Sequence, residues 1–183
     1  MKKGILMKNY LPDKGECFIF DTNILIDLFY PMDLGKDVSS ISDLYDKIIK
    51  NRATMLLTSI QVSEFINRCI RFQYELYKKD HPECEDYKKD YRITEDYAQC
   101  MNTILDIIKN EWMVRFEFIN DNFKDLEKEK LFFHEFAYDF NDAIIVEIAK
   151  KYSATLVTND KDYISYDLPN RIVTSNRLLL SIR

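Results

Sequence analysis

Several short apolar runs in this chain stop abruptly at a polar or acidic residue, and segments of helical periodicity follow them. The first run, Cys17–Phe20, ends at Asp21, and a later run, Ala154–Thr158, ends at Asn159 and Asp160. Such short runs without alternation are typical of strands that are buried on both faces of a parallel sheet. The pattern therefore predicts an α/β domain in which helices cover both faces of the sheet.

Predicted strands and helices are distributed along the whole chain. Predicted strands lie at residues 17–20, 55–58, 114–119, 154–158 and 171–174. Predicted helices lie at 24–29, 39–51 (capped by Ser39 or Ser40), 60–79 (capped by Ser59), 94–108, 122–137 and 143–152, whereas 80–92 is predicted as a loop or frayed insertion. We expect a three-layer α/β/α fold with a central, mostly parallel sheet of four or five short strands.

The composition fits one folded domain and excludes some classes of protein. In a chain of 183 residues, 46% of them apolar, only 3 Gly and 4 Pro are present, so a sizeable core can form. The net charge of −5 argues against a bulk electrostatic nucleic-acid binder but leaves room for a local basic strip. The four cysteines are far apart without a C-x-x-C pair, and neither a secretory leader nor an apolar run near about 20 residues is present. We therefore expect a cytoplasmic protein with reduced thiols and no membrane partner.

Acidic residues follow the predicted strands or begin the predicted helices. Asp21 and Asp160 follow strands, Asp142 lies in the first turn of a helix, and Glu64 lies one turn into another. In an open parallel sheet, sites form outside the carboxyl ends of the strands, so the four carboxylates can converge there. Four such groups would repel one another unless a divalent cation compensated them, and oxygen-only ligands suit Mg²⁺ or Mn²⁺. The sequence therefore predicts a magnesium or manganese site.

These residues resemble the motifs of the PIN-domain nucleases. The resemblance rests on four segments in order: Phe20-Asp21-Thr22-Asn23-Ile24-Leu25, Thr58-Ser59 with Glu64, Asn141-Asp142-Ala143-Ile144-Ile145, and Leu156-Val157-Thr158-Asn159-Asp160-Lys161-Asp162-Tyr163. It extends from about Cys17 to Thr174. Each segment alone is a weak signal, but four in the right order form a fairly strong joint one. The resemblance implies a single PIN-like domain over 17–183, with an N-terminal extension over 1–16 and an elaboration around 80–110.

The resemblance also implies an activity and roles for individual residues. It implies a metal-dependent endoribonuclease that acts on single-stranded RNA, like the toxins of VapBC toxin–antitoxin pairs. Asp21 and Asp142 would be the firmest ligands of one or two Mg²⁺ or Mn²⁺ ions, and Glu64 and Asp160 would complete the cluster directly or through water. The polar side chains Asn23 and Thr158 would orient water, carboxylate or phosphate. An antitoxin protein and a second copy of the chain are candidate partners.

Structural interpretations compete with these roles. Asp21 could cap a helix, and Glu64 could form an ion-pair face with Arg68 and Arg71. Asp139 competes with Asp142, and Asp162 competes with Asp160. A group of basic residues could cradle phosphates, but acids interleave with it and favour a mixed-charge surface; its members are Arg68, Arg71, Lys78, Lys79, Lys88, Lys89 and Arg92. Neither His81 nor His134 lies in a motif typical of a general base.

Two other functions compete with the nuclease. The first is a non-catalytic PIN-like scaffold that binds RNA or protein without cutting it. The second is a phosphoryl-transferring enzyme of the haloacid-dehalogenase type, which also places an Asp after its first strand. That family has D-x-D-x-T at this point, whereas Asn23 stands here in place of the second acid. The sequence therefore favours the nuclease over the dehalogenase type.

Overall fold

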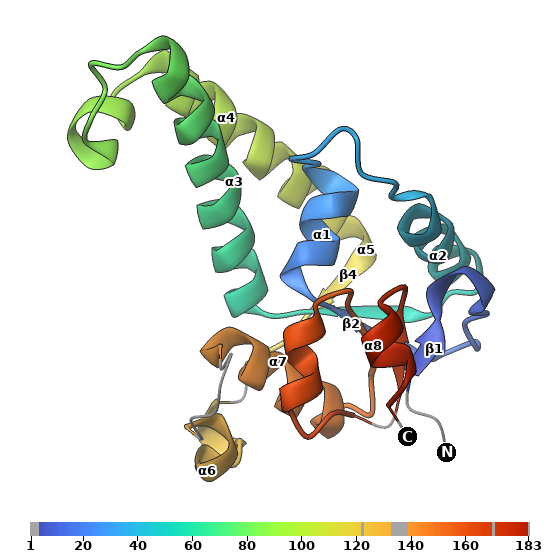
Figure 1. Cartoon of the computed structure of the whole chain (residues 1–183). Coiled ribbons are helices and arrows are strands. Elements are labelled where there is room, and N and C mark those ends of the chain that lie inside the picture. Colours follow the sequence, from blue (N-terminus) through green and yellow to red (C-terminus); the bar gives the residue numbers. More distant parts are fainter. Residues whose placement is uncertain (1–3, 122, 133–138, 170, 183) are drawn as a thin grey trace.

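A six-stranded sheet, parallel throughout, forms the centre of the computed structural model, which describes residues 4–121, 123–132, 139–169 and 171–182 (Figure 1). Its strands are β1 (Gly4–Leu6), β2 (Cys17–Phe20), β3 (Thr54–Leu57), β4 (Phe116–Phe118), β5 (Thr155–Val157) and β6 (Ile172–Thr174). Their order is β1-β6-β5-β2-β3-β4. Five of these strands were expected from the sequence, and β1 is the additional one.

The strand order reverses direction between β2 and β5. From β2 the chain moves outward to β3 and then β4, whereas β5 and β6 lie on the other side. The register of the β2–β5 pair places Phe20 opposite Val157. A reversal of this kind is where open α/β sheets form their binding crevices.

Alternate residues of the strands enter two separate cores. Phe18 and Phe20 of β2 belong to one core, whereas Ile19 between them belongs to the other. The first core contains residues of α1 (Thr22–Phe29), α2 (Ser39–Lys50), α3 (Ser59–Asp80) and α4 (Glu95–Ile107). The second contains residues of α6 (Lys128–Leu131), α7 (Phe140–Lys151) and α8 (Arg177–Leu180). Because each face of the sheet has its own core, the predicted three-layer α/β/α class is confirmed.

Two predicted helix caps are wrong by one or two residues. Helix α3 begins at Ser59, and its cap is Thr58, which forms a reciprocal capping box with Gln61. Helix α2 begins at Ser39, and the carboxylate of Asp37 accepts the amide N–H of that residue at 2.9 Å. The acceptor lies one residue before the predicted cap in α3 and two residues before Ser39 in α2.

Helices α3 and α4 extend as a hairpin beyond the edge of the sheet (Figure 1). A cluster of tyrosine rings joins them, with neighbouring centroids 5.2 to 5.9 Å apart, and its members are Tyr74, Tyr77, Tyr87, Tyr91 and Tyr97. Tyr91 is fully buried, and it lies in a π-helical turn, Tyr87–Tyr91, within the segment predicted as a loop. Aromatic packing therefore orders part of a segment whose charges suggested a frayed insertion.

The helix predicted at 122–137 is wrong in its described part. Instead of one helix, the chain forms a short 3-10 turn, Phe123–Asp125, and the four-residue helix α6. The remainder of the predicted helix, including His134, lies outside the described residues. A second π-helical turn, Ile108–Trp112, and the short helix α5, Met113–Arg115, connect α4 to β4.

Residues Gly4–Leu6, at the start of the described part of the chain, take part in the sheet. Within the expected extension, β1 pairs with β6 along Gly4, Ile5 and Leu6.

The four cysteines are free thiols, as expected. Among the described helices, none is both long enough and apolar enough to span a bilayer.

The edge strand β1 leaves no room for a side chain at Gly4. A Cβ atom there would lie 2.2 Å from the backbone oxygen of Leu179 in α8. We therefore expect Gly4→Ala to lower the free energy of unfolding by about 1–3 kcal/mol, because rigid backbone must shift. Urea unfolding measures this loss. Gly35→Ala is the control, since its Cβ would approach only the side chain of Asp33, at 3.3 Å, and an equal loss in the two variants would contradict the packing argument.

Candidate functional site

Asp21 lies at the carboxyl end of β2 and caps α1. Its backbone N–H donates to the carbonyl of Val157 at 2.9 Å, which continues the β2–β5 ladder by one residue. Its carboxylate accepts the amide N–H of Asn23 at 3.3 Å and the hydroxyl of Thr158 at 2.9 Å. The side chain is 3% exposed. The competing interpretation of Asp21 as a helix cap is therefore correct. The same carboxylate also contacts Thr158, the residue that follows β5.

Asp160 lies beside Asp21 at the end of β5. Its backbone N–H donates to the hydroxyl of Thr158 at 3.0 Å, and its carboxylate accepts the N–H of Asp162 at 2.9 Å, capping the 3-10 turn Lys161–Ser165. Of the two competing acids, Asp160 is therefore the one whose carboxylate lies toward α1. Asp162 supplies the backbone N–H that this carboxylate binds.

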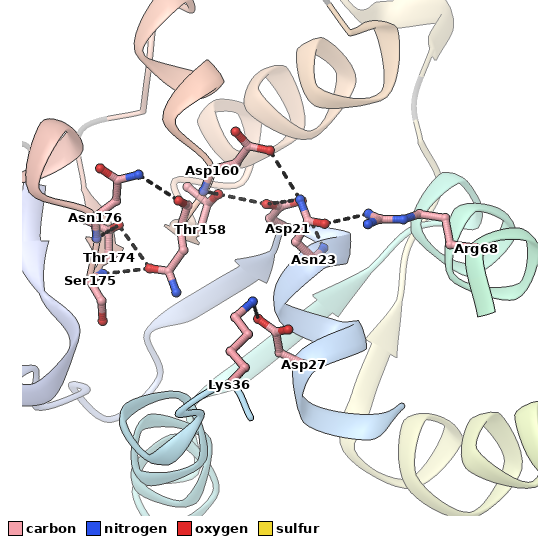
Figure 2. Close-up of polar contacts among 11 residues, drawn as sticks. Asp21, Asn23, Asp27, Lys36, Arg68, Thr158, Asp160, Thr174, Ser175 and Asn176 are labelled. Carbon is pink, nitrogen blue, oxygen red and sulfur yellow. Dashed lines mark hydrogen bonds and ion pairs between the residues drawn. The ribbon is translucent and has the colours of Figure 1, made fainter. Parts of the chain in front are cut away.

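Asn23 connects the acids of the two strand ends. Its side-chain amide donates to Asp160 at 3.3 Å and to Asp21 at 3.4 Å, while its carbonyl oxygen accepts the guanidinium Nη1 of Arg68 at 2.6 Å. Figure 2 shows this chain of contacts, with Asn23 between Asp160 and Arg68. Asn23 thus lies beside the acids, as expected, and its side chain contacts two of them.

Glu64 approaches the same edge from α3. Its carboxylate accepts the hydroxyl of Thr22 at 3.0 Å and the side-chain amide of Asn141 at 3.4 Å, and Arg68 lies 3.5 Å from it. The start of α3 is fixed by Gln61, whose amide donates to the carbonyl of Phe20 at 2.5 Å. Glu64 therefore has the expected ion pair with Arg68 and also contacts α1 and α7.

Asp142 completes the group from the first turn of α7. Asp139 caps this helix, accepting the amide N–H groups of Asn141 at 2.7 Å and of Asp142 at 3.4 Å. The capping role leaves Asp142 as the half-buried acid whose charge interacts with Asp21 and Asp160. The structure thus brings all four expected acids to one edge of the sheet.

The buried acids perturb one another strongly. Burial raises the pKa of Asp21 to about 6, although hydrogen bonds from Thr158 and Asn23 lower it, and the charges of Asp160 and Glu64 raise it further. Burial also raises the pKa of Asp142 to about 8, with the charge of Asp21 as the next contribution. A like-charged neighbour and a dry surrounding both disfavour the ionised form. The folded protein therefore holds protons on Asp21 and Asp142 more readily than isolated carboxyl groups do.

The donors at this edge suit a hard divalent cation. Within the described residues, no three His, Cys, Asp or Glu side chains stand close enough together to hold a metal ion as they are placed. The candidate ligands nevertheless all carry oxygen donors, as Mg²⁺ and Mn²⁺ prefer. Tyr163 is fully buried near Asp142 and lowers its pKa, yet its hydroxyl makes no hydrogen bond of normal geometry within the described chain. The residues therefore fit a divalent ion or its bound water, provided that the carboxylates move closer together.

Sequence reasoning missed three residues that contact the acids. Thr22 and Asn141 hold Glu64, and Tyr163 lies near Asp142. All three lie inside the motif segments quoted from the sequence, each next to an acidic residue, and that position could have indicated them as site residues. Their contacts depend on how α1, α3 and α7 meet and could not be inferred from spacing alone.

His81 lies at the opposite end of α3 from Glu64. Its ring stacks on Tyr77 with centroids 4.1 Å apart, and Nδ1 lies 3.2 Å from a carboxylate oxygen of Glu83. These contacts account for the residue as part of the hairpin surface.

Comparison with known proteins gives a matching family model and similar solved structures. A family model described as PIN domain matches residues 18–168. A chain of the VapBC2 complex from Rickettsia felis, solved bound to a DNA fragment from its promoter, is 23% identical to this chain. The alignment covers 87% of this chain and 98% of that one, with a TM-score of 0.47. No curated protein matches the sequence.

The raised pKa values make the stability of the metal-free protein depend on pH. The folded protein retains a proton on Asp142 up to about pH 8, whereas the unfolded chain releases it near 3.8. Stability should therefore fall as pH rises between these values. We expect Asp142→Asn to raise Tm at pH 8 in EDTA by about 2–4 °C, corresponding to about 1 kcal/mol, and to change it little at pH 4. Thermal melts of both proteins across this range provide the measurement, and a parallel shift at every pH would contradict the assignment.

Proposed function

The chain belongs to the PIN-domain family, and from that premise we propose that it is a metal-dependent endoribonuclease that hydrolyses phosphodiester bonds of single-stranded RNA. The observation that carries the proposal is the convergence of Asp21, Glu64, Asp142 and Asp160 at one edge of the sheet. These residues come from four separate elements, so a role in capping a single helix does not account for the group.

Each residue has a proposed role that agrees with its contacts. Asp21 and Asp142, the two acids with raised pKa values, are the proposed principal ligands of Mg²⁺ or Mn²⁺. Glu64 and Asp160 complete the ligand group directly or through water. When bound, the metal lowers the pKa of a water molecule and stabilises negative charge on the leaving oxygen.

The polar neighbours hold the acids in place for this chemistry. Thr158 donates to Asp21, and Asn23 donates to both Asp21 and Asp160, so each carboxylate has a fixed orientation. Hydrogen bonds to a ligating carboxylate are typical of metal sites and contribute to metal affinity. We propose this orienting role for Asn23 and Thr158.

We further propose that the nuclease is the toxin of a toxin–antitoxin pair, on the basis of the motifs that it shares with VapBC toxins. An antitoxin protein would then be its partner, and the active form could include a second copy of the chain. A small DNA-binding protein encoded beside this reading frame would support the toxin role over housekeeping RNA processing.

Loss of one acid should abolish cleavage. We expect the wild-type protein to cleave labelled single-stranded RNA in Mg²⁺ but not in EDTA, and Asp21→Asn to reduce the rate by about 100-fold or more, because it removes a proposed metal ligand. Asp43→Asn is the matched control, since Asp43 is exposed on α2. Equal cleavage with Mg²⁺, with EDTA and by Asp21→Asn would refute the proposal.

A non-catalytic scaffold is the second candidate, favoured by the spread of the acids in the described residues. Metal binding separates the two. If an ion binds only the folded state, Mg²⁺ at 100 times its Kd should stabilise the protein by about 2.7 kcal/mol, a rise in Tm that a thermal melt detects. Asp142→Asn should lose most of that rise. No rise with millimolar Mg²⁺ or Mn²⁺ would favour the scaffold.

A further inference from the structure

Arg68 extends from α3 toward the acidic edge, one helical turn beyond Glu64. Its Nη1 atom donates to Asn23 at 2.6 Å (Figure 2) and lies 3.5 Å from the carboxylate of Glu64. Both contacts use Nη1, and the side chain remains 41% exposed. The guanidinium therefore has further N–H donors directed away from these two partners.

The basic residues farther along the hairpin are placed differently. The guanidinium of Arg71 lies 3.8 Å from the centre of the Tyr87 ring, and that of Arg92 lies 5.8 Å from the Tyr97 ring. Their cationic groups are thus occupied by the tyrosine cluster. Sequence grouped them with Arg68 as one mixed-charge surface, whereas Arg68 alone among these three contacts residues of the acidic site.

A shallow hollow of about 320 Å³ lies beside Arg68, between α3 and α7. Its lining residues are Ile60, Ser63, Glu64, Asn67, Arg68 and Asn141. Apart from Ile60 and Glu64, each of them carries a hydrogen-bond donor. Asn141 donates to Glu64 and Asn67 donates to Ser63, so the donors that can face an anion there are the exposed guanidinium of Arg68 and the hydroxyl of Ser63.

We propose that Arg68 and this hollow bind a backbone phosphate of the RNA strand, adjacent to the phosphate that is cut. The proposal rests on the proposed nuclease function, which it deepens by naming a substrate-binding subsite. A guanidinium matches the geometry of phosphate oxygens and remains charged at all physiological pH values. In a protein with a net charge of −5, a cation at this place lets an anionic strand approach a group of carboxylates.

The competing explanation is that Arg68 only braces Asn23 and Glu64. A brace would act on the position of the acids and hence on the rate of the bond-breaking step. A phosphate contact acts on binding of the strand and contributes to its dependence on salt. The two explanations therefore predict changes in different measured quantities.

Binding of a fluorescently labelled single-stranded RNA in EDTA, across a series of KCl concentrations, tests the phosphate contact. We expect Arg68→Gln to weaken binding about tenfold at low salt and to reduce the slope of log K against log salt by about 0.7. Arg68→Lys keeps the charge and should retain most of the slope. Arg52→Gln is the control, because Arg52 is exposed and precedes β3 at the opposite edge of the sheet.

Cleavage kinetics in Mg²⁺ supply the second measurement. We expect Arg68→Gln to raise KM about tenfold, as the loss of a contact made equally in the ground and transition states does. A fall in kcat with an unchanged KM and an unchanged salt slope would overturn the proposal in favour of the brace. Thermal melts establish that the variants are folded.

The outcomes distinguish this proposal from the proposed function. If wild-type protein binds the RNA but does not cut it, and Arg68→Gln reduces the salt slope, the subsite stands and the nuclease function fails. If wild-type protein cuts the RNA and Arg68→Gln matches it in KM and salt slope, the subsite fails alone. Wild-type protein that neither binds nor cuts the strand overturns both.

Discussion

The parallel pairing of β2 with β5 is the constraint on which the rest of the site depends. The ladder places Phe20 opposite Val157, so Asp21 and Thr158 leave the sheet side by side and are joined by a 2.9 Å hydrogen bond. Because the strand order reverses at this pair, the helices that bring Glu64 and Asp142 pack on opposite faces of the sheet. The acidic residues therefore meet although they are far apart in sequence.

Repulsion among the acids is balanced by neutral and cationic side chains. Asn23 contacts two carboxylates and one guanidinium, and Glu64 is held by Thr22, Asn141 and Arg68. The result is a set of carboxylates close enough to shift one another's pKa values but too widely spaced, among the described residues, to enclose an ion without movement. Such a site is suited to exchange a proton for a cation, since both relieve the same electrostatic strain.

The sequence predicted those parts of the fold that depend on local patterns. Unbroken apolar runs such as Cys17–Phe20 are typical of strands buried on both faces of a sheet, and the acids that follow them lie at the carboxyl ends of those strands. β1 was missed because Gly4–Leu6 is too short to carry a pattern and pairs with a strand at the other end of the chain. The role of Arg68 likewise depends on tertiary contacts, since spacing along α3 relates it to Glu64 but says nothing of Asn23 on α1.

The pairing of the first strand with the last has a kinetic consequence. During synthesis β2 and β3 can pair early, but β1 has no neighbour in the sheet until Ile172–Thr174 has been made. This contact joins Gly4 to Ile172, so closing the loop between them is entropically costly and late. Until then the side of β5 that β6 covers has no partner strand, and an unpaired strand edge of this kind can pair with another chain.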